Sequence, residues 1–115
     1  MKEEFNYLEV IKKDESKRFE LTIDGHIAFI DFTQRGTDVI KLIHNEVPKE
    51  LLIHTEVPKE LGGRGIAAVL VEKTLQYLEK NKFTLYPICP YVFAYIKKHP
   101  AWKRIVNENF KGFEK

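Results

Sequence analysis

One long amphipathic segment, residues 63–81, constrains the fold more than any other part of the chain. On a 3.6-residue period its apolar side chains, among them Ile66, Leu70 and Leu78, share one side, and charged side chains share the other. A strand-like stretch precedes this segment, and residues 83–89 form another after it. This order predicts a helix that lies on a sheet and joins two parallel strands by a right-handed crossover.

The first third of the chain carries the pattern of an antiparallel meander. Residues 18–23 alternate between apolar and polar side chains, as in a half-buried strand. Asp24-Gly25 is a strong two-residue hairpin signal. Residues 26–33 follow with two apolar-rich alternating sets, which predict a strand covered on both faces. The other expected elements are a short first strand within 5–12, a turn at 34–38, a strand from Val39 to Ile43, a helix over 91–98 started by Pro90, and a last short helix over 101–109.

Composition narrows the class of protein. The chain has 115 residues, 43% of them hydrophobic, which suits a single domain with its own core. A net charge of +2 argues against a dedicated nucleic-acid binder. No apolar stretch approaches the ~20 residues needed to span a bilayer, and no apolar leader opens the chain. The single cysteine cannot form an internal disulfide, so we expect a cytoplasmic protein without membrane contact. Four scattered histidines and one cysteine predict no metal site.

A tandem repeat interrupts the chain before the long helix. Residues 42–51 and 52–61 differ only at Asn45 and Thr55. One ten-residue repeat is too short for a solenoid, so we interpret it as a duplicated strand end and exit turn within a single domain, residues 1–115. Because the second copy leads directly into the glycines, we expect it to form the functional strand that feeds the glycine-rich segment. The first copy would then bulge out or extend the hairpin. In the alternative, the first copy takes the strand position and the second becomes an insertion.

The glycine-rich segment Gly62-Gly-Arg-Gly65 stands between a strand and a helix start. The first turn of a helix offers unpaired N–H groups and a partial positive charge, and glycines let an anion approach the backbone. The patterns of the phosphate loop and of the dinucleotide fold are both absent. From these residues alone, a phosphate cradle and a plain glycine-rich turn both stay open.

The surrounding motifs point to one family. Gly62–Ala67 resembles the acetyl-CoA signature of the GNAT N-acetyltransferase superfamily: Gly65 and Ala67 match its last two fixed positions, and Gly62 stands where the signature has Gln or Arg. Three further stretches complete the resemblance to a minimal, stand-alone GNAT subfamily, and together they cover about residues 18–102. These are His-Thr-Glu-Val-Pro at 54–58, Pro-Ile-Cys-Pro-Tyr-Val at 87–92 and His-Pro-Ala-Trp at 99–102.

The resemblance implies a fold, a cosubstrate and a set of contacts. The fold is a minimal GNAT-like α/β (α+β) domain, with a mostly antiparallel mixed sheet, one long helix after the glycines and short C-terminal helices. Acetyl-CoA would lie with its pantetheine arm in a splayed strand pair and its pyrophosphate before the long helix, and a cysteine at position 89 would face the acetyl group. The acceptor would be an unidentified amine. The residues implied in cofactor binding are Thr55, Val57, Gly62, Gly63, Arg64, Gly65, Ile66 and Ala67.

Four residues are candidates for catalysis. Cys89 ends a strand just before a helix start, where a thiolate would be stabilised, although buried cysteines are often inert. His54 and Glu56 are two apart on a strand, so they share a side, and either can act as general base. Tyr91 can protonate a departing thiolate or simply pack, together with Tyr95 one turn later.

Three kinds of function remain open from the sequence. The leading one is an acetyl-CoA-dependent N-acetyltransferase, by direct attack of the amine or through an acetyl-Cys89 intermediate. The second is a module that binds CoA or acyl-CoA with little or no turnover. The third is an interaction protein in which the duplicated strand mediates dimerisation, so the chain is either a monomer or a strand-mediated dimer.

Overall fold

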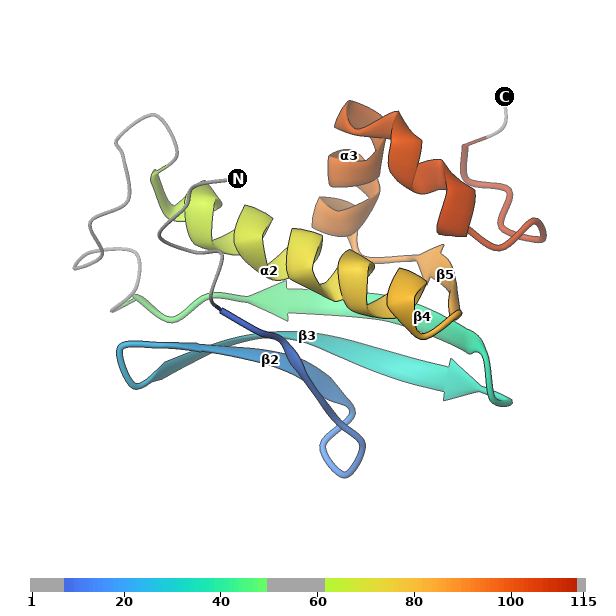
Figure 1. Cartoon of the computed structure of the whole chain (residues 1–115). Helices are drawn as coiled ribbons and strands as arrows, with labels where there is room; N and C mark the ends of the chain where they lie inside the picture. Colours follow the sequence, from blue (N-terminus) through green and yellow to red (C-terminus); the bar gives the residue numbers. More distant parts are fainter. Residues whose placement is uncertain (1–7, 50–61, 114–115) are drawn as a thin grey trace.

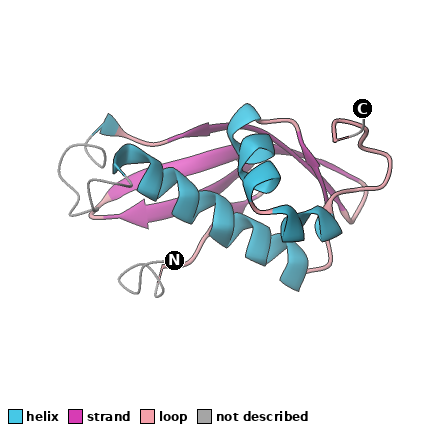
Figure 2. Ribbon diagram, turned by 90° about the horizontal axis from the view of Figure 1, so that it is seen from above, coloured by secondary structure: helices cyan, strands magenta, loops and turns pink. Residues whose placement is uncertain are grey.

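A computed structural model describes residues 8–49 and 62–113, with the backbone alone described for 62–64. Five strands form one sheet in the order β1-β2-β3-β4-β5, and the helices lie together on one of its faces (Figures 1 and 2). The α/β class and the minimal GNAT-like arrangement predicted from the sequence are confirmed. In chain order the elements are β1 (Ile11–Lys13), β2 (Arg18–Ile23), β3 (His26–Arg35), β4 (Val39–Glu46), α2 (Gly62–Lys80), β5 (Thr84–Pro87), α3 (Pro90–Lys98) and the 3₁₀ helix η2 (Pro100–Ile105).

The meander forms as the sequence predicts. Strands β1 to β4 pair antiparallel with their sequence neighbours. The β2–β3 turn places Asp24 at φ 50° and Gly25 at φ 79°, the left-handed backbone that favours Asp-Gly at a two-residue hairpin turn. Within the described residues β1 is a strand of three residues, Ile11–Lys13, which is shorter than the stretch expected within 5–12.

The prediction that the third strand is covered on both faces is wrong. Its residues Ala28, Ile30 and Phe32 are buried against the helices. On the other face Ile27 is 44% exposed, and the guanidinium of Arg18 lies 3.7 Å from the ring centre of Phe29. A cation over an aromatic face shields that ring without a second layer of structure. The many apolar residues of β3 therefore reflect one core face and one partly shielded outer face.

The crossover from β4 through α2 to β5 produces the parallel strand pair that the sequence predicts. Pairing runs from Val39 opposite Thr84 to Leu42 opposite Pro87. Helix α2 lies across the sheet and fills the core with its apolar side (Figure 1). The fully buried side chains of this layer, each 0% exposed, are Ile40, Leu42, Ile66, Leu70, Val71, Leu75, Leu78 and Leu85.

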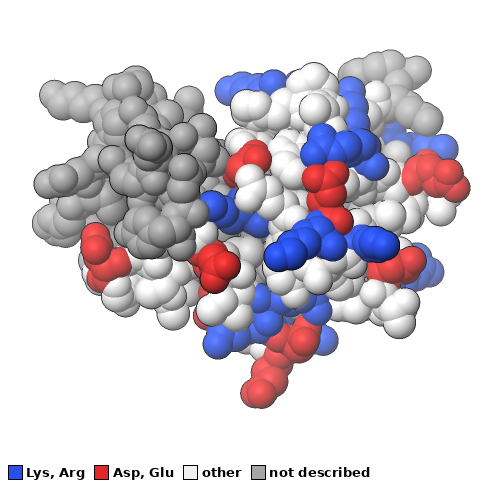
Figure 3. All heavy atoms as spheres, viewed as in Figure 1, with Lys and Arg blue, Asp and Glu red and all other residues white. Residues whose placement is uncertain are grey.

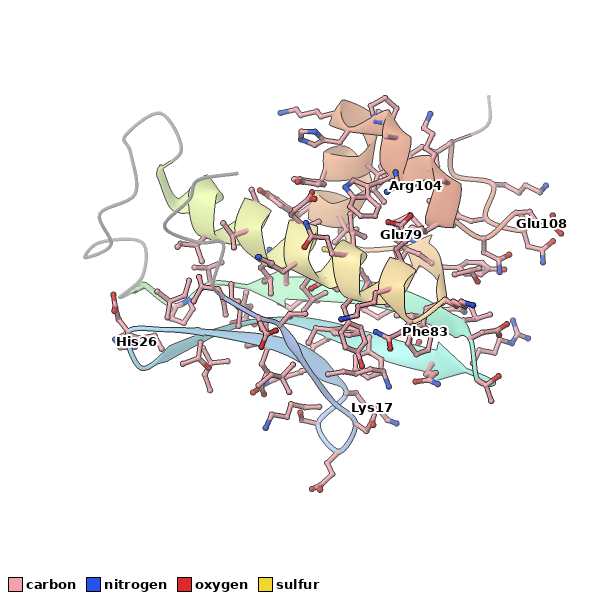
Figure 4. The ribbon with its side chains drawn as sticks, in the orientation of Figure 1. Lys17, His26, Glu79, Phe83, Arg104 and Glu108 are labelled. Carbon is pink, nitrogen blue, oxygen red and sulfur yellow. The ribbon has the colours of Figure 1, made fainter. Side chains whose placement is uncertain are left out.

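Helix α2 also has a second packed side, against α3 and η2. Val69 on this side is only 2% exposed, and an ion pair joins Arg104 of η2 to Glu79 of α2 (Figure 4). Trp102 is buried and belongs to the hydrophobic core. The last helix is 3₁₀ and ends at Ile105, earlier than the 101–109 span predicted. The C-terminal elements α3 and η2 thus pack against α2 on the side of the helix that does not face the sheet.

Charges are mixed over the visible surface of the described residues. On the face shown in Figure 3, Lys and Arg side chains alternate with Asp and Glu side chains. In the part of the chain that the structure describes, no helix is long and apolar enough to cross a membrane.

Candidate active site

A β-bulge divides β4 into two halves. Phe32 of β3 pairs with Leu42, but the preceding residue, Asp31, pairs with His44, so Ile43 is an extra residue on β4. Side chains of a regular strand alternate between faces, and one extra residue reverses that alternation. Asn45, opposite the buried Ile30, therefore faces the helices, as Leu42 does.

Strands β4 and β5 separate at the same place. Their pairing extends to Leu42 and Pro87, and the last backbone link is the Cys89 N–H, which donates to the Leu42 carbonyl oxygen at 2.7 Å. Beyond this link, β4 continues to Glu46 while the other strand turns into α3 at Pro90. We call the divergence of β4 from β5 after Leu42 and Pro87 the fork.

Cys89 stands at the fork. It is the N-cap residue of α3, its carbonyl oxygen accepts a hydrogen bond from the Phe93 N–H at 2.9 Å, and its residue surface is 1% exposed. The thiol donates to the side-chain oxygen of Asn45 across the fork, with 3.3 Å between Sγ and Oδ1. The first turn of α3, with its partial positive charge, begins directly after this residue.

His44 and Glu46 lie on the opposite face of the sheet from this thiol. They pair with Asp31 and Phe29 on the outer face, and their side chains, 57% and 60% exposed, interact with 3.0 Å between Nε2 and Oε2. The predicted sharing of a side by a histidine and a glutamate two residues apart is thus seen in the first copy. The equivalents that were predicted as bases, His54 and Glu56, lie outside the described residues.

The glycines form the first turn of α2. A helix that begins at Gly62 leaves the N–H groups of Gly62, Gly63 and Arg64 without partners inside the helix. No acidic residue occupies this turn, so its partial positive charge is not offset there. Gly65, Ile66 and Ala67 are buried residues, and Ile66 is part of the core, so these three residues contribute backbone and packing rather than an exposed side chain.

A half-buried carboxylate holds α3 and η2 onto α2. Glu72 accepts hydrogen bonds from the Tyr95 hydroxyl at 2.6 Å, the Trp102 indole at 3.1 Å and the Gln76 amide at 3.1 Å. Partial burial works to raise the pKa of Glu72, but these three hydrogen bonds outweigh it and hold the pKa below its usual value. Burial, followed by the bond to Glu72, raises the pKa of Tyr95 well above its usual range.

This carboxylate network was not predicted from the sequence. Glu72 falls on the charged side of the amphipathic pattern, and nothing in that pattern shows that α3 covers this side. Tyr95 packs against the core, which was one of the two roles considered, and it also donates a hydrogen bond. Tyr91, one turn earlier on α3, is half-buried against the core. Its predicted role as an acid stays a prediction.

The copy of the repeat that forms β4 is not the one expected. The first copy extends the β3–β4 hairpin, which was one of its two predicted fates, and it also pairs with β5, so it takes the strand position that the alternative arrangement gave it. The second copy, residues 52–61, lies outside the described residues, and so do the predicted cofactor contacts Thr55 and Val57.

Asn45 is the site residue that sequence reasoning missed, and the flanks of the repeat held the signal. Before the first copy, Ile40 continues the inward alternation with Leu42, and both are 0% exposed. The residue equivalent to Ile40 before the second copy is Glu50. Placing the second copy in this strand would put a glutamate into the core, which is costly without a partner.

The fold is a small α/β domain with a parallel strand pair that opens beside a glycine-rich helix start. The chain belongs to the GCN5-related N-acetyl-transferase family, whose model matches residues 18–105. A search of the curated proteins found no match to the chain.

Proposed function

We propose that the protein transfers an acetyl group from acetyl-CoA to an amine, with the reaction at the fork between β4 and β5. The observation that carries this proposal is the position of Cys89. Its thiol is held where the two parallel strands part, one residue before a helix start and next to a strand edge that no longer pairs with β5. The family match to residues 18–105 supports the same class of reaction.

The described residues fit such a cosubstrate. Backbone groups of β4 beyond Leu42 face the fork rather than β5, so they suit the amides of a pantetheine arm. The first turn of α2, with Gly62, Gly63 and Arg64 and no acidic side chain, suits a pyrophosphate. When bound, acetyl-CoA supplies an acetyl group activated as a thioester.

In the proposed route, Cys89 carries the acetyl group between donor and amine. The Cys89 sulfur forms a bond to the acetyl carbon, the bond from that carbon to the CoA sulfur breaks, and the thiol proton leaves with CoA. The amine then attacks the acetyl carbon, the bond to Cys89 breaks, and the amine proton returns to the thiol. Tyr91, in the first turn of α3, is our candidate for relaying this proton from the thiol to the departing CoA sulfur.

The outer face of the sheet supplies the candidate base. His44 and Glu46 hold in β4 the positions predicted for His54 and Glu56, and they lie on the far side of the sheet from Asn45. A hydrogen-bonded imidazole and carboxylate can take a proton from an amine that enters the fork from that side. In the direct route this pair would act without any covalent intermediate.

The test measures binding first and chemistry second. We expect calorimetry on the full chain to show heat with CoA and with acetyl-CoA; no heat and no thermal stabilisation at millimolar ligand would overturn the proposal. Intact mass after incubation with acetyl-CoA should show one added acetyl group, and the adduct should be absent in Cys89→Ala. Substantial amine acetylation by Cys89→Ala would replace the cysteine route with direct transfer.

A second candidate, a CoA-binding module with little turnover, is favoured by one observation. The Cys89 thiol is 1% exposed, and among the described residues it hydrogen-bonds to an amide and not to a base. Binding of CoA without acetylation of any amine class would support this reading.

A further inference from the structure

We propose that Asn45 is the residue that positions the Cys89 sulfur and governs its ionisation, and that the two copies of the repeat differ in this one property. This inference rests on the proposed function for its catalytic meaning, but the contact and its test do not need acetyl-CoA.

The bulge is what makes the contact. In an unbroken strand the even-numbered series Ile40, Leu42, His44 and Glu46 would share the inner face. The extra residue Ile43 turns His44 and Glu46 outward and Asn45 inward. The strand thereby presents an uncharged amide to the sulfur and keeps the titratable side chains of His44 and Glu46 on the other face.

Two hydrogen bonds to β4, one from the backbone and one from the side chain, fix the position of Cys89. The residue is tied to β4 by the backbone bond from the Cys89 N–H to the Leu42 oxygen, and its side chain reaches Asn45 Oδ1 at 3.3 Å. Both bonds go to β4, three residues apart. With a residue exposure of 1%, solvent competes little for this sulfur. A single amide therefore dominates its polar surroundings within the described residues.

An asparagine suits both charge states of a thiol. The amide oxygen accepts the proton of the neutral thiol, as in this structure, and the amide nitrogen has two hydrogens to donate to a thiolate after rotation of the side chain. An aspartate of the same shape would accept from the thiol but repel the thiolate. Threonine, the residue of the second copy, is shorter and offers one hydroxyl in place of the amide.

The first measurement is spectroscopic and benefits from the chain having one cysteine. The S–H stretching band in the infrared then reports Cys89 alone, and Cys89→Ser identifies it by removing it. We expect the band of Asn45→Ala to move to higher frequency, toward that of a free thiol, while Asn109→Ala, a matched change at an exposed asparagine, leaves it in place. An unmoved band in Asn45→Ala would overturn the proposal.

The second measurement follows the thiolate. The rate of alkylation by iodoacetamide, measured against pH by intact mass, should be about tenfold lower at neutral pH in Asn45→Asp and should recover as the pH is raised, because a carboxylate beside the sulfur disfavours its charged form. Asn109→Asp should retain the original profile. An Asn45→Asp profile equal to that of Asn109→Asp would refute the assignment.

The second copy of the repeat allows a reciprocal experiment. Thr55→Asp changes the equivalent position of the second copy. A displaced profile in Thr55→Asp, with an unchanged one in Asn45→Asp, would show that the second copy supplies the partner of Cys89 and would overturn the inference. A shifted band and profile at Asn45 in a protein that binds no CoA would leave this inference standing and reject the proposed function.

Discussion

The two halves of β4 are built for different purposes. From Val39 to Leu42 the strand lies between β3 and β5, and Ile40 and Leu42 are wholly buried beneath α2. From Ile43 to Glu46 it pairs with β3 alone among the described residues, and exposed or half-buried side chains replace buried ones. The same strand is thus a core element at one end and the wall of a candidate active site at the other.

The difference comes from one extra residue together with the end of β5. Pro87 ends the paired segment of β5, and the bulge at Ile43 coincides with the point where that neighbour is lost. A proline cannot donate to a strand ladder, and a bulge bends and twists its strand. Both features lie at the fork, where β4 loses its pairing with β5 and turns the Asn45 side chain toward Cys89.

The largest effect should come from breaking the core half. Leu42→Ala removes a fully buried side chain, and we expect it to lower the free energy of unfolding by about 2–5 kcal/mol. Ile43→Ala is its matched control one residue later, where the side chain is 36% exposed, and should cost less than about 1 kcal/mol. Urea unfolding followed by circular dichroism measures both. Equal costs would mean that the two halves do not differ as described.

The next largest effect should come from weakening the hydrogen bonds that hold α3 and η2 onto α2. Glu72→Gln keeps the shape of the side chain but removes the charge that receives bonds from Tyr95 and Trp102. We expect a loss of about 1–2 kcal/mol near neutral pH, at the low end for charged hydrogen bonds because the carboxyl is partly exposed. Glu79→Gln, at the exposed ion pair with Arg104, is the matched control and should cost less.

The pH dependence of that variant has a definite sign. The folded pKa of Glu72 lies below its usual value of 4.5, so the stabilisation is complete above 4.5 and is lost as the pH falls through the folded pKa. Unfolding midpoints from pH 7 down to pH 3 should therefore converge for the parent and Glu72→Gln. A constant gap across that range would show that the charge of Glu72 is not what stabilises α3 and η2.

Much of the fold follows from local patterns. Alternation and the Asp24-Gly25 turn predicted β2 and the hairpin, and the 3.6-residue period predicted α2 to within a residue at each end. The candidate site was predicted less completely from the sequence, because it depends on contacts between segments that are far apart in the chain. The inward turn of Asn45 requires the pairing of Asp31 with His44, and the burial of Glu72 requires α3 to cover the polar side of α2.

A smaller effect on stability is expected from changes in the second half of β4, from Ile43 to Glu46. His44→Ala and Glu46→Ala each remove one partner of an exposed pair, and each should change the free energy of unfolding by less than about 0.5 kcal/mol. If the pair serves as the base, amine acetylation should fall at least about tenfold in the same variants. A stable variant with full acetylation would remove the outer face from the mechanism while leaving Cys89 and Asn45 untouched.

The smallest change in stability is expected between two chains from which one or the other copy of the repeat has been removed. This comparison tests the fork alone, because the two chains differ at a single position there. Deleting residues 52–61 or residues 42–51 leaves the same sequence except for Asn or Thr at one position, and both keep Ile40 ahead of the surviving copy. Because the inward alternation through Ile40 sets the register, both shortened chains should form β4 in place and unfold within about 0.5 kcal/mol of each other. Only the chain that keeps Asn45 should retain the original S–H band of Cys89. Identical bands in two equally stable chains would show that the repeat's single difference has no bearing on the cysteine.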